Sequence, residues 1–453
     1  MKRLTKNCEV LPSVGNTAAK RFSLLFIFIL SWSLTNAQQH WLMNNPDGFS
    51  FYLTTTIDEG SFTANTRKNA LIDILGEERF KGAKLKYPEI IHLDGKNESG
   101  KISGSYQAIS KDLSFNGTID NDTLKIIVES NGMPAYQLIG TKVDATVPLR
   151  DYSKSFEKVF NLTEENIYNQ SFIMSQHWQQ FKSTMISKST SMLDDYEFQI
   201  AFSMIARKLP FSHYYLYASK DDKDANKHPD MAFLKELDAR TCLLEVKQFT
   251  GTKEQMDSLI QIVDTKKYEN LIIDLRNNPG GSHMAAFPLV EYIIDKTIIA
   301  GVFPNKNWYK EYDRLPTKED YSKFSEFTGG SFEEWFNKAK NNYGAYFKVS
   351  PAPIHFEGQV YVLTNKRTGS TCEPIVYGLK ENKYAIIIGE PTAGAMLSSN
   401  EFVFDEIFTL RIPLNDYITY SGDRIDMVGI APDIEVKSDK ALDYALKMIA
   451  NNN

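Results

Sequence analysis

The sequence predicts a multidomain α/β protein, in which an N-terminal antiparallel β domain and a helical segment precede an α/β core. Three patterns support this prediction, in chain order: short strands between turn residues, apolar residues at helical spacing, and strands alternating with helices. A chain of 453 residues also exceeds the size of one hydrophobic core. The expected parts are a signal peptide (1–37), a β-barrel or sandwich domain (38–150), a helical segment (151–225) and the α/β core (226–453).

The composition is that of a globular protein, with 42% hydrophobic and 24% charged residues and a formal net charge of −6. No basic stripe accompanies the aromatic residues, so nothing indicates a nucleic-acid partner. The sequence has no His-Glu-x-x-His motif, no cysteine pair at zinc spacing and no phosphate-binding glycine loop. We therefore expect neither a metal nor a cofactor.

The N-terminus has the pattern of a secretory signal. Lys20 and Arg21 precede an apolar run over 22–34, and Thr35-Asn36-Ala37 then offers small residues to a signal peptidase. The run is shorter than the ~20 residues that span a bilayer. The sequence predicts a secreted or periplasmic protein with no membrane span after cleavage. The alternative is an uncleaved membrane anchor.

Cleavage after Ala37 leaves two cysteines, Cys242 and Cys372, in the mature chain. One pair does not make a disulfide framework, and both residues lie in apolar or site-like stretches. They are therefore expected to be buried free thiols.

Residues 40–151 are predicted to form a series of short strands. Apolar and polar residues alternate from Phe49 to Thr54, and further strands are predicted from Leu113 and from Leu124. Turns are predicted at 45–48, 94–95, 116–117 and 131–132, where Asn-Gly or Asp-Gly pairs occur. This pattern indicates a small antiparallel barrel or sandwich without a catalytic motif.

The pattern is helical over 152–209, where aromatic and aliphatic residues recur mostly three or four positions apart. A polar stretch, Ser219 to Asp230, is predicted to be a linker or exposed loop. The α/β core is then predicted to have strands at 241–246, 270–275, 358–364 and 384–389, with helices at 253–264, through 375–379 and at 439–449. The strand at 270–275 is expected to be buried, because its apolar residues follow one another without alternation. Strands that alternate with helices predict a largely parallel sheet with crossover helices.

Two loops follow buried strands, which is where open α/β sheets bind ligands. The first is Asp-Leu-Arg-Asn-Asn-Pro-Gly-Gly, ending in Gly280 and Gly281, whose backbone can turn amide groups toward a ligand. The second is Thr-Gly-Ser-Thr-Cys-Glu, which places Ser370 at the start of a helix, where the positive end of the dipole favours an oxyanion. From glycine content alone, an ordinary strand-ending turn is the better explanation of the first loop. An N-cap serine explains the second loop as well as a nucleophile does.

In combination, four motifs in this order resemble the C-terminal-processing (tail-specific) serine peptidase family over about 232–437. They are the Asn-Asn-Pro-Gly-Gly loop, the Gly-Ser-Thr-Cys-Glu turn, Ile-Gly-Glu-Pro-Thr-Ala-Gly at 388–394 and Val-Gly-Ile-Ala-Pro-Asp-Ile at 428–434. The resemblance implies a ClpP/crotonase-like α/β core. It also implies that Ser370 is the nucleophile and that the N–H groups of Thr371 and of Gly280 or Gly281 form the oxyanion hole.

The family's catalytic lysine has no counterpart, because its position falls on Ala395. The chain is instead similar to the tricorn-like branch, which implies roles for Ser212-His213 and for Asp426. In this hypothesis His213 takes the proton of Ser370, and Asp426 and Ser212 orient the imidazole. That branch usually has the longer Glu at the carboxylate position, so the aspartate needs a bridging water or Ser212. His283, two residues beyond the glycine pair, is the rival base.

The resemblance implies a serine-type endopeptidase that cleaves peptides or protein tails through an acyl-enzyme. Only the short stretch at 219–230 stands where the family inserts its PDZ domain, so that domain is expected to be missing. The alternative is a non-proteolytic protein that binds apolar ligands or peptides on the same fold. The oligomeric state is not predicted.

Overall fold

The computed structural model describes residues 38–44, 48–58, 60–109, 111–130, 133–144, 148–219 and 231–451. The described chain is a mixed α/β protein with an N-terminal antiparallel β domain, so the predicted fold class is confirmed. It divides into two compact units, which are residues 1–149 with 193–197, and residues 150–192 with 198–453. The predicted signal peptide and, from residue 220 onward, the predicted linker lie outside the described residues.

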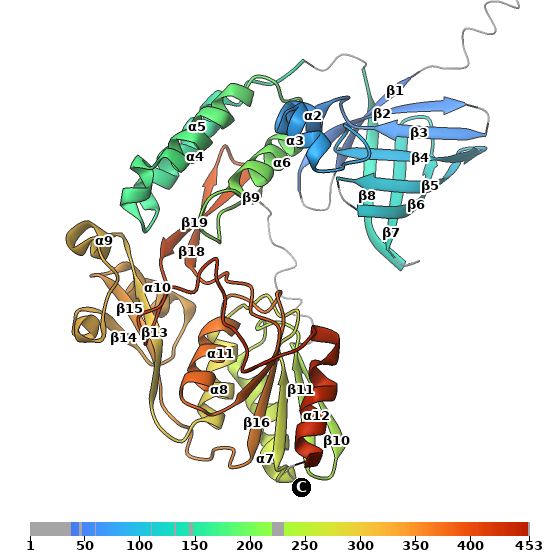
Figure 1. Cartoon of the computed structure of the whole chain (residues 1–453). Coiled ribbons are helices and arrows are strands. Elements are labelled where there is room, and N and C mark those ends of the chain that lie inside the picture. The colour runs from blue at the N-terminus through green and yellow to red at the C-terminus, as the bar shows by residue number, and fades with distance from the viewer. Residues whose placement is uncertain are drawn as a thin grey trace, which may run out of the picture. The chain divides into compact units, whose positions relative to one another are not determined.

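The first unit contains a closed eight-stranded antiparallel barrel (Figure 1). Closure follows from the pairing of β1 with both β2 and β8. Its inward-facing residues are large and buried, among them Trp41, Phe51, Phe62 and Phe115, so the interior is a packed core. The elements are β1 (Gln39–Asn44), β2 (Ser50–Asp58), β3 (Ser61–Asn65), α2 (Ala70–Leu75), α3 (Glu77–Gly82), β4 (Ile91–Glu98), β5 (Lys101–Ala108), β6 (Lys111–Ile119), β7 (Thr123–Ser130) and β8 (Met133–Val143).

Two of the four predicted turns are wrong. Asp94-Gly95 lies inside β4 and Asn116-Gly117 inside β6, whereas Ser99-Gly100 forms the turn between β4 and β5. Gly95 pairs with Gly104, and a Cβ on Gly95 would stand 2.1 Å from the carbonyl oxygen of Ser103. These glycines permit close approach between strands rather than a change of direction. The predicted turn at 131–132 and residues 45–47 of the other lie outside the described residues.

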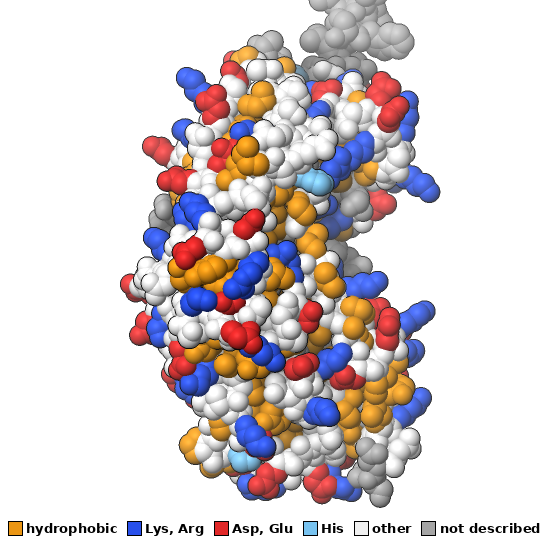
Figure 2. All heavy atoms as spheres, turned by 60° about the vertical axis from the view of Figure 1, so that its left-hand side comes forward, with side chains coloured by type: hydrophobic (Ala, Val, Ile, Leu, Met, Phe, Trp, Pro, Cys, Tyr) orange, Lys and Arg blue, Asp and Glu red, His pale blue; other side chains and the backbone are white. Residues whose placement is uncertain are grey.

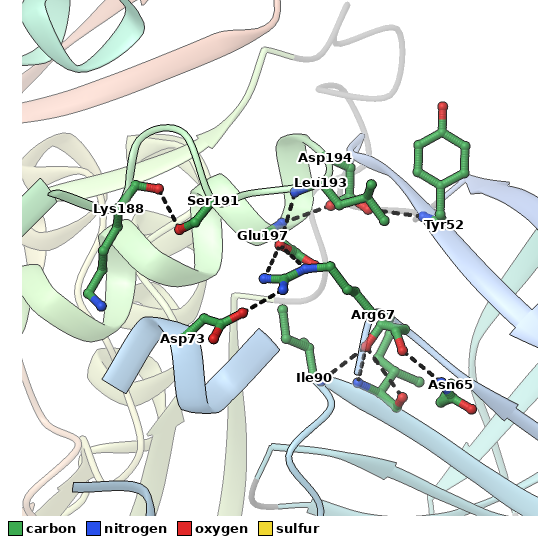
Figure 3. Close-up of polar contacts among 12 residues, drawn as sticks. Tyr52, Asn65, Arg67, Asp73, Ile90, Lys188, Ser191, Leu193, Asp194 and Glu197 are labelled. Carbon is green, nitrogen blue, oxygen red and sulfur yellow. Dashed lines mark hydrogen bonds and ion pairs between the residues drawn. The ribbon is translucent and has the colours of Figure 1, made fainter. Parts of the chain in front are cut away.

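An arginine holds the segment 193–197 on the barrel, as Figure 3 shows. The guanidinium of Arg67 donates to both carboxylate oxygens of Glu197, at 3.0 Å each, and to Asp73. Glu197 is only 2% exposed, so its charge requires this partner. Asp194 accepts hydrogen bonds from the backbone of Tyr52 and of Glu197, and burial, reinforced by the Glu197 carboxylate, raises the pKa of Asp194 to about 7.

The described residues of the second unit form three sheets. The largest has the order β10-β11-β12-β16-β17-β21, in which only β10 is antiparallel to its neighbour. The strands of the second unit are β9 (Tyr215–Ala218), β10 (Ala232–Asp238), β11 (Thr241–Val246), β12 (Asn270–Asp274), β13 (Ile298–Pro304), β14 (Ser325–Phe327), β15 (Gly344–Val349), β16 (Gln359–Thr364), β17 (Ile386–Gly389), β18 (Ser398–Phe404), β19 (Phe408–Asn415), β20 (Ile418–Thr419) and β21 (Ile434–Glu435). Its helices are α4 (Ser153–Asn166), η1 (Gln170–Met174), α5 (Gln176–Lys188), most of α6 (Asp195–Ala206), α7 (Lys253–Lys266), α8 (His283–Ile293), α9 (Lys306–Tyr312), η2 (Lys318–Lys323), α10 (Phe332–Lys340), α11 (Cys372–Glu381), η3 (Ser438–Lys440) and α12 (Ala441–Asn451).

Helices cover both faces of the large sheet. Apolar residues of α7, α8 and α11 pack on one face, and Ala441, Ala445 and Ile449 of α12 pack on the other (Figure 1). A sheet buried on both faces explains the unbroken apolar runs of its strands. The predicted parallel sheet with crossover helices is therefore confirmed. Because its strands are parallel, the loops that follow them lie at the same edge of the sheet, the carboxyl edge.

The surface mixes charges of both signs. On the face in Figure 2, lysine and arginine side chains alternate with aspartate and glutamate, and apolar patches lie between them. Within the described ranges, no helix combines the length and apolar character required to cross a membrane.

Candidate active site

Ser370 lies in the loop between β16 and α11, at the carboxyl edge of the parallel sheet. Its φ is 53°, a left-handed conformation that is uncommon outside glycine. Its backbone N–H donates to the carbonyl of Ala395 at 3.0 Å. Its hydroxyl has no hydrogen-bond partner among the described residues, so the turn presents a serine side chain that the fold does not use.

The glycine pair faces this serine. A Cβ on Gly280 would stand 2.6 Å from the Cβ of Ser370 and 2.9 Å from the amide nitrogen of Thr371, so only glycine fits there. The N–H of Gly280 donates to the side chain of Asn278 at 2.8 Å, and the hydroxyl of Thr371 donates to the carbonyl of Gly281 at 2.6 Å. In the described part of the chain, the N–H groups of Gly281 and Thr371 have no acceptor.

Ser212 bridges a carboxylate and an imidazole. Its hydroxyl donates to Oδ1 of Asp426 at 2.5 Å and lies 2.7 Å from Nδ1 of His213, while its backbone N–H donates to Oδ2 of Asp426 at 3.0 Å. A hydroxyl has one proton, and the carboxylate accepts it. Nδ1 of His213 is therefore the donor to Ser212, and Nε2 carries the free lone pair.

One peptide unit connects this hydrogen-bonded group to the serine turn. The carbonyl of Ala395 accepts from the N–H of Ser370, and the adjoining N–H of Met396 donates to Oδ1 of Asp426 at 2.9 Å. The carboxylate is thus at most about 8 Å from the backbone nitrogen of Ser370, given standard peptide dimensions. The structure brings Ser370, Asp426, Ser212 and His213 into one region of the second unit. Among the described contacts, no hydrogen bond joins His213 directly to Ser370.

Glu373 is the residue of this site that sequence reasoning missed. It lies one turn after Ser370, is 0% exposed and accepts from the hydroxyl of Thr392 at 2.6 Å and from the N–H groups of Gly394 and Ala395 at 2.8 Å each. Burial raises the pKa of Glu373, and these hydrogen bonds oppose the rise. A glutamate in the first turn of an apolar helix is the signal that could have identified it.

Burial controls the charge of the histidine. His213 is 9% exposed, and desolvation, together with the positive charge of Arg411, lowers the pKa of His213 to about 4. The imidazole is therefore neutral at neutral pH, as a proton acceptor must be. Burial also raises the pKa of Asp426, whereas hydrogen bonds from Ser212 and Met396 lower it.

The rival base, His283, has a different environment. It is 6% exposed at the start of α8, and its Nε2 has no hydrogen-bond partner. Aromatic rings surround it, the nearest being Phe327 with a centroid separation of 5.1 Å. Among the described residues, no carboxylate accepts a hydrogen bond from its ring, so the structure does not give it the environment of a general base. Cys242 and Cys372 are both buried and free.

These features define an α/β protein with a polar site at the carboxyl edge of a parallel sheet and an unpartnered serine at the start of a helix. Residues 240–436 match the sequence model of peptidase family S41. This match confirms, over residues 240–436, the resemblance to C-terminal-processing peptidases that the sequence motifs indicate.

Two relatives bear the name of processing peptidases. The chain is 25% identical over 191 residues to carboxyl-terminal-processing peptidase 2, chloroplastic, of Arabidopsis thaliana, and 21% identical over 204 residues to the carboxyl-terminal-processing protease of a Picosynechococcus strain. These matches cover 42% and 45% of this chain but only 30% and 40% of those proteins. The tricorn protease is a structural neighbour, with a TM-score of 0.45 and 11% identity over 88% of this chain and 46% of the tricorn chain.

Proposed function

We propose that this protein is a serine-type endopeptidase that cleaves peptides or protein tails through an acyl-enzyme at Ser370. The observation that carries the proposal is the hydrogen-bonded series Asp426–Ser212–His213, which leaves Nε2 of a neutral imidazole available in the region of the second unit that also holds Ser370. The pattern at 20–37 further supports export through a signal peptide.

In the proposed reaction, Oγ of Ser370 attacks the scissile carbonyl while its proton passes to Nε2 of His213. The N–H groups of Gly281 and Thr371 are the proposed oxyanion donors, since Asn278 already occupies the N–H of Gly280. The imidazolium returns the proton to the leaving amine, and the acyl group stays on Ser370. Water then attacks the ester with His213 again as base, which releases the acid and restores the serine.

Asp426 stabilises the imidazolium through the Ser212 hydroxyl rather than by direct contact. Ser212 gives its proton to the carboxylate and accepts one from Nδ1, so it transmits the negative charge and sets the tautomer of His213. This arrangement compensates for an aspartate where the related branch usually has the longer glutamate.

Covalent labelling tests the proposal without knowledge of the natural substrate. The full chain is incubated with a fluorophosphonate probe, and the modified residue is located by mass spectrometry of its peptides. We expect one label, on Ser370, and none in Ser370→Ala. A folded wild-type protein that stays unlabelled would contradict the peptidase proposal. Saturable binding of apolar ligands by that protein would then favour the alternative, a non-proteolytic binding protein.

The low pKa of His213 predicts an unusual pH profile. Because the base must be neutral, activity should rise with pH through about 4 in the free enzyme rather than through 6.5. Arg411→Met removes a nearby positive charge and should move this acid limb to higher pH. The limb should stay below 6.5 because burial, the larger cause, remains. Arg411→Lys keeps the charge and is the matched control. The measurement is kcat/KM from pH 3.5 to 8, and an identical limb in both variants would contradict this electrostatic account.

A further inference from the structure

A pocket of about 490 Å³ lies at the amino edge of the large sheet, and we call it the amino-edge pocket. It is lined by the last turn of α7, by residues 267–269 before β12, by residues 353–358 before β16, and by Tyr292 near the end of α8. Ser370 follows β16 at the carboxyl edge, so the six residues of β16 separate the pocket from the serine turn by about 20 Å. The pocket is therefore distinct from the proposed active site, and its volume is within the range of about 300–1,000 Å³ that is typical of small-molecule sites.

Aromatic rings form part of its walls. The rings of Tyr292 and Phe356 have centroids 6.0 Å apart, and Tyr268 contributes a third ring. Tyr292 is only 4% exposed, and its hydroxyl has no hydrogen-bond partner among the described residues. Burial, reinforced by the charge of Asp264, raises the pKa of Tyr292 to about 12, so this hydroxyl is protonated at neutral pH. A buried polar group without a partner calls for an explanation, and a ligand in the pocket would supply the missing hydrogen bond.

The charge of the lining is negative. Three carboxylates line the pocket against one lysine and one histidine, so the net charge is negative even when the histidine is protonated. Asp264 accepts a hydrogen bond from Lys267 at 3.1 Å, and Glu269 is paired with Arg240, which lies outside the pocket. Glu357 has neither a hydrogen bond nor an ion pair among the described residues. The pocket therefore contains one carboxylate whose charge no described side chain offsets.

We propose that the amino-edge pocket binds a small organic ammonium ion, whose charge pairs with Glu357 and whose apolar body contacts the aromatic rings. A carboxylate and the face of an aromatic ring both attract a cation. The apolar part of the lining, which includes Pro353 and Ile354, favours an organic cation over a metal ion, because a metal ion such as Ca²⁺ requires several oxygen ligands. An anion of the same size would be repelled by the carboxylates.

Matched probes test the inference on the full chain. Phenethylamine, 2-phenylethanol and 3-phenylpropionate have the same phenyl ring and two-carbon stem, and they end in a cation, a neutral group and an anion. Binding of each is measured by a saturation-transfer NMR titration. We expect phenethylamine to bind with a Kd of about 1 mM, as is usual for so small a ligand. The alcohol should bind about 5-fold more weakly, the difference expected from one partly solvated ion pair, and the propionate should bind more weakly still.

The preference for the amine is then measured in Glu357→Gln, which keeps the size of the side chain and removes its charge. The amine and the alcohol should bind this variant equally, to within about 2-fold. Glu381→Gln is the matched control, since Glu381 is exposed and lies outside the pocket, and it should keep the wild-type preference. Glu357 is also exposed, so the urea unfolding curve of Glu357→Gln should match that of the wild type. Equal binding of the two probes by the wild type, no saturable binding of phenethylamine, or an unchanged preference in Glu357→Gln would each overturn the inference.

Discussion

Replacing His213 with alanine is expected to lower kcat/KM for peptide cleavage by about 10⁴-fold, close to the loss expected from Ser370→Ala. The two side chains act as one unit, because the hydroxyl is a weak nucleophile until the imidazole takes its proton. The double variant should therefore lose little more than either single variant. Turnover of fluorescent casein, or the rate of fluorophosphonate labelling for His213→Ala, provides the measurement.

The matched control is His177→Ala, which removes an exposed histidine from α5 of the same unit. It should leave the rate unchanged. If His213→Ala keeps activity within about 10-fold of the wild type, the proposal that His213 takes the proton is wrong, since a positioned general base contributes about 10²–10⁴-fold to the rate. Activity that fell equally in His177→Ala would indicate damage to the helical region rather than loss of a base.

Glu373→Gln is expected to lower kcat/KM by about 10²-fold without removing any group that touches the substrate, the loss that follows a displacement of about 1 Å. Its carboxylate accepts three hydrogen bonds from the loop that includes Gly394 and Ala395. A glutamine turns an amide N–H₂ group toward those donors, and each buried donor left unpaired costs about 1–3 kcal/mol. The loop would shift, and with it the peptide unit that links Ser370 to Asp426.

The control is Glu381→Gln, an exposed position at the end of the same helix, which should leave activity and stability unchanged. Activity is followed by kcat/KM and stability by urea unfolding. Because Glu373 acts through the loop, the pH of the acid limb should stay that of the wild type while the rate falls. Wild-type activity in a folded Glu373→Gln protein would show that the loop does not depend on this carboxylate.

Much of the fold could be predicted from local sequence. The strands at 241–246 and 270–274 are visible from the consecutive apolar residues at their centres, since a strand buried on both faces does not alternate apolar with polar residues. The region between His283 and the strand at Gln359–Thr364 was not predicted, although it holds α8, β13, α10 and β15. The proline inside α8, at position 288, and the mixed character of the small sheet obscure the periodicity there.

In the barrel, glycine residues led to predicted turns that the structure does not have. Gly95 and Gly117 follow residues typical of hairpin turns, yet both lie within strands because a neighbouring backbone approaches where a Cβ would be. Local sequence does not distinguish a glycine needed for a turn from one needed for close approach.

By itself, the sequence determined the order of the elements, the loops that end the strands and the residues in those loops that can carry chemistry. These properties are local, because periodicity and turn chemistry act within a few residues. Only the tertiary structure decided that Ser212 bonds Asp426, 214 positions away, that the N–H of Gly280 is occupied, and that His213 is buried enough to be neutral. Each of these depends on which segments pack together, because hydrogen-bond partners and desolvation are set by neighbours in space rather than along the chain.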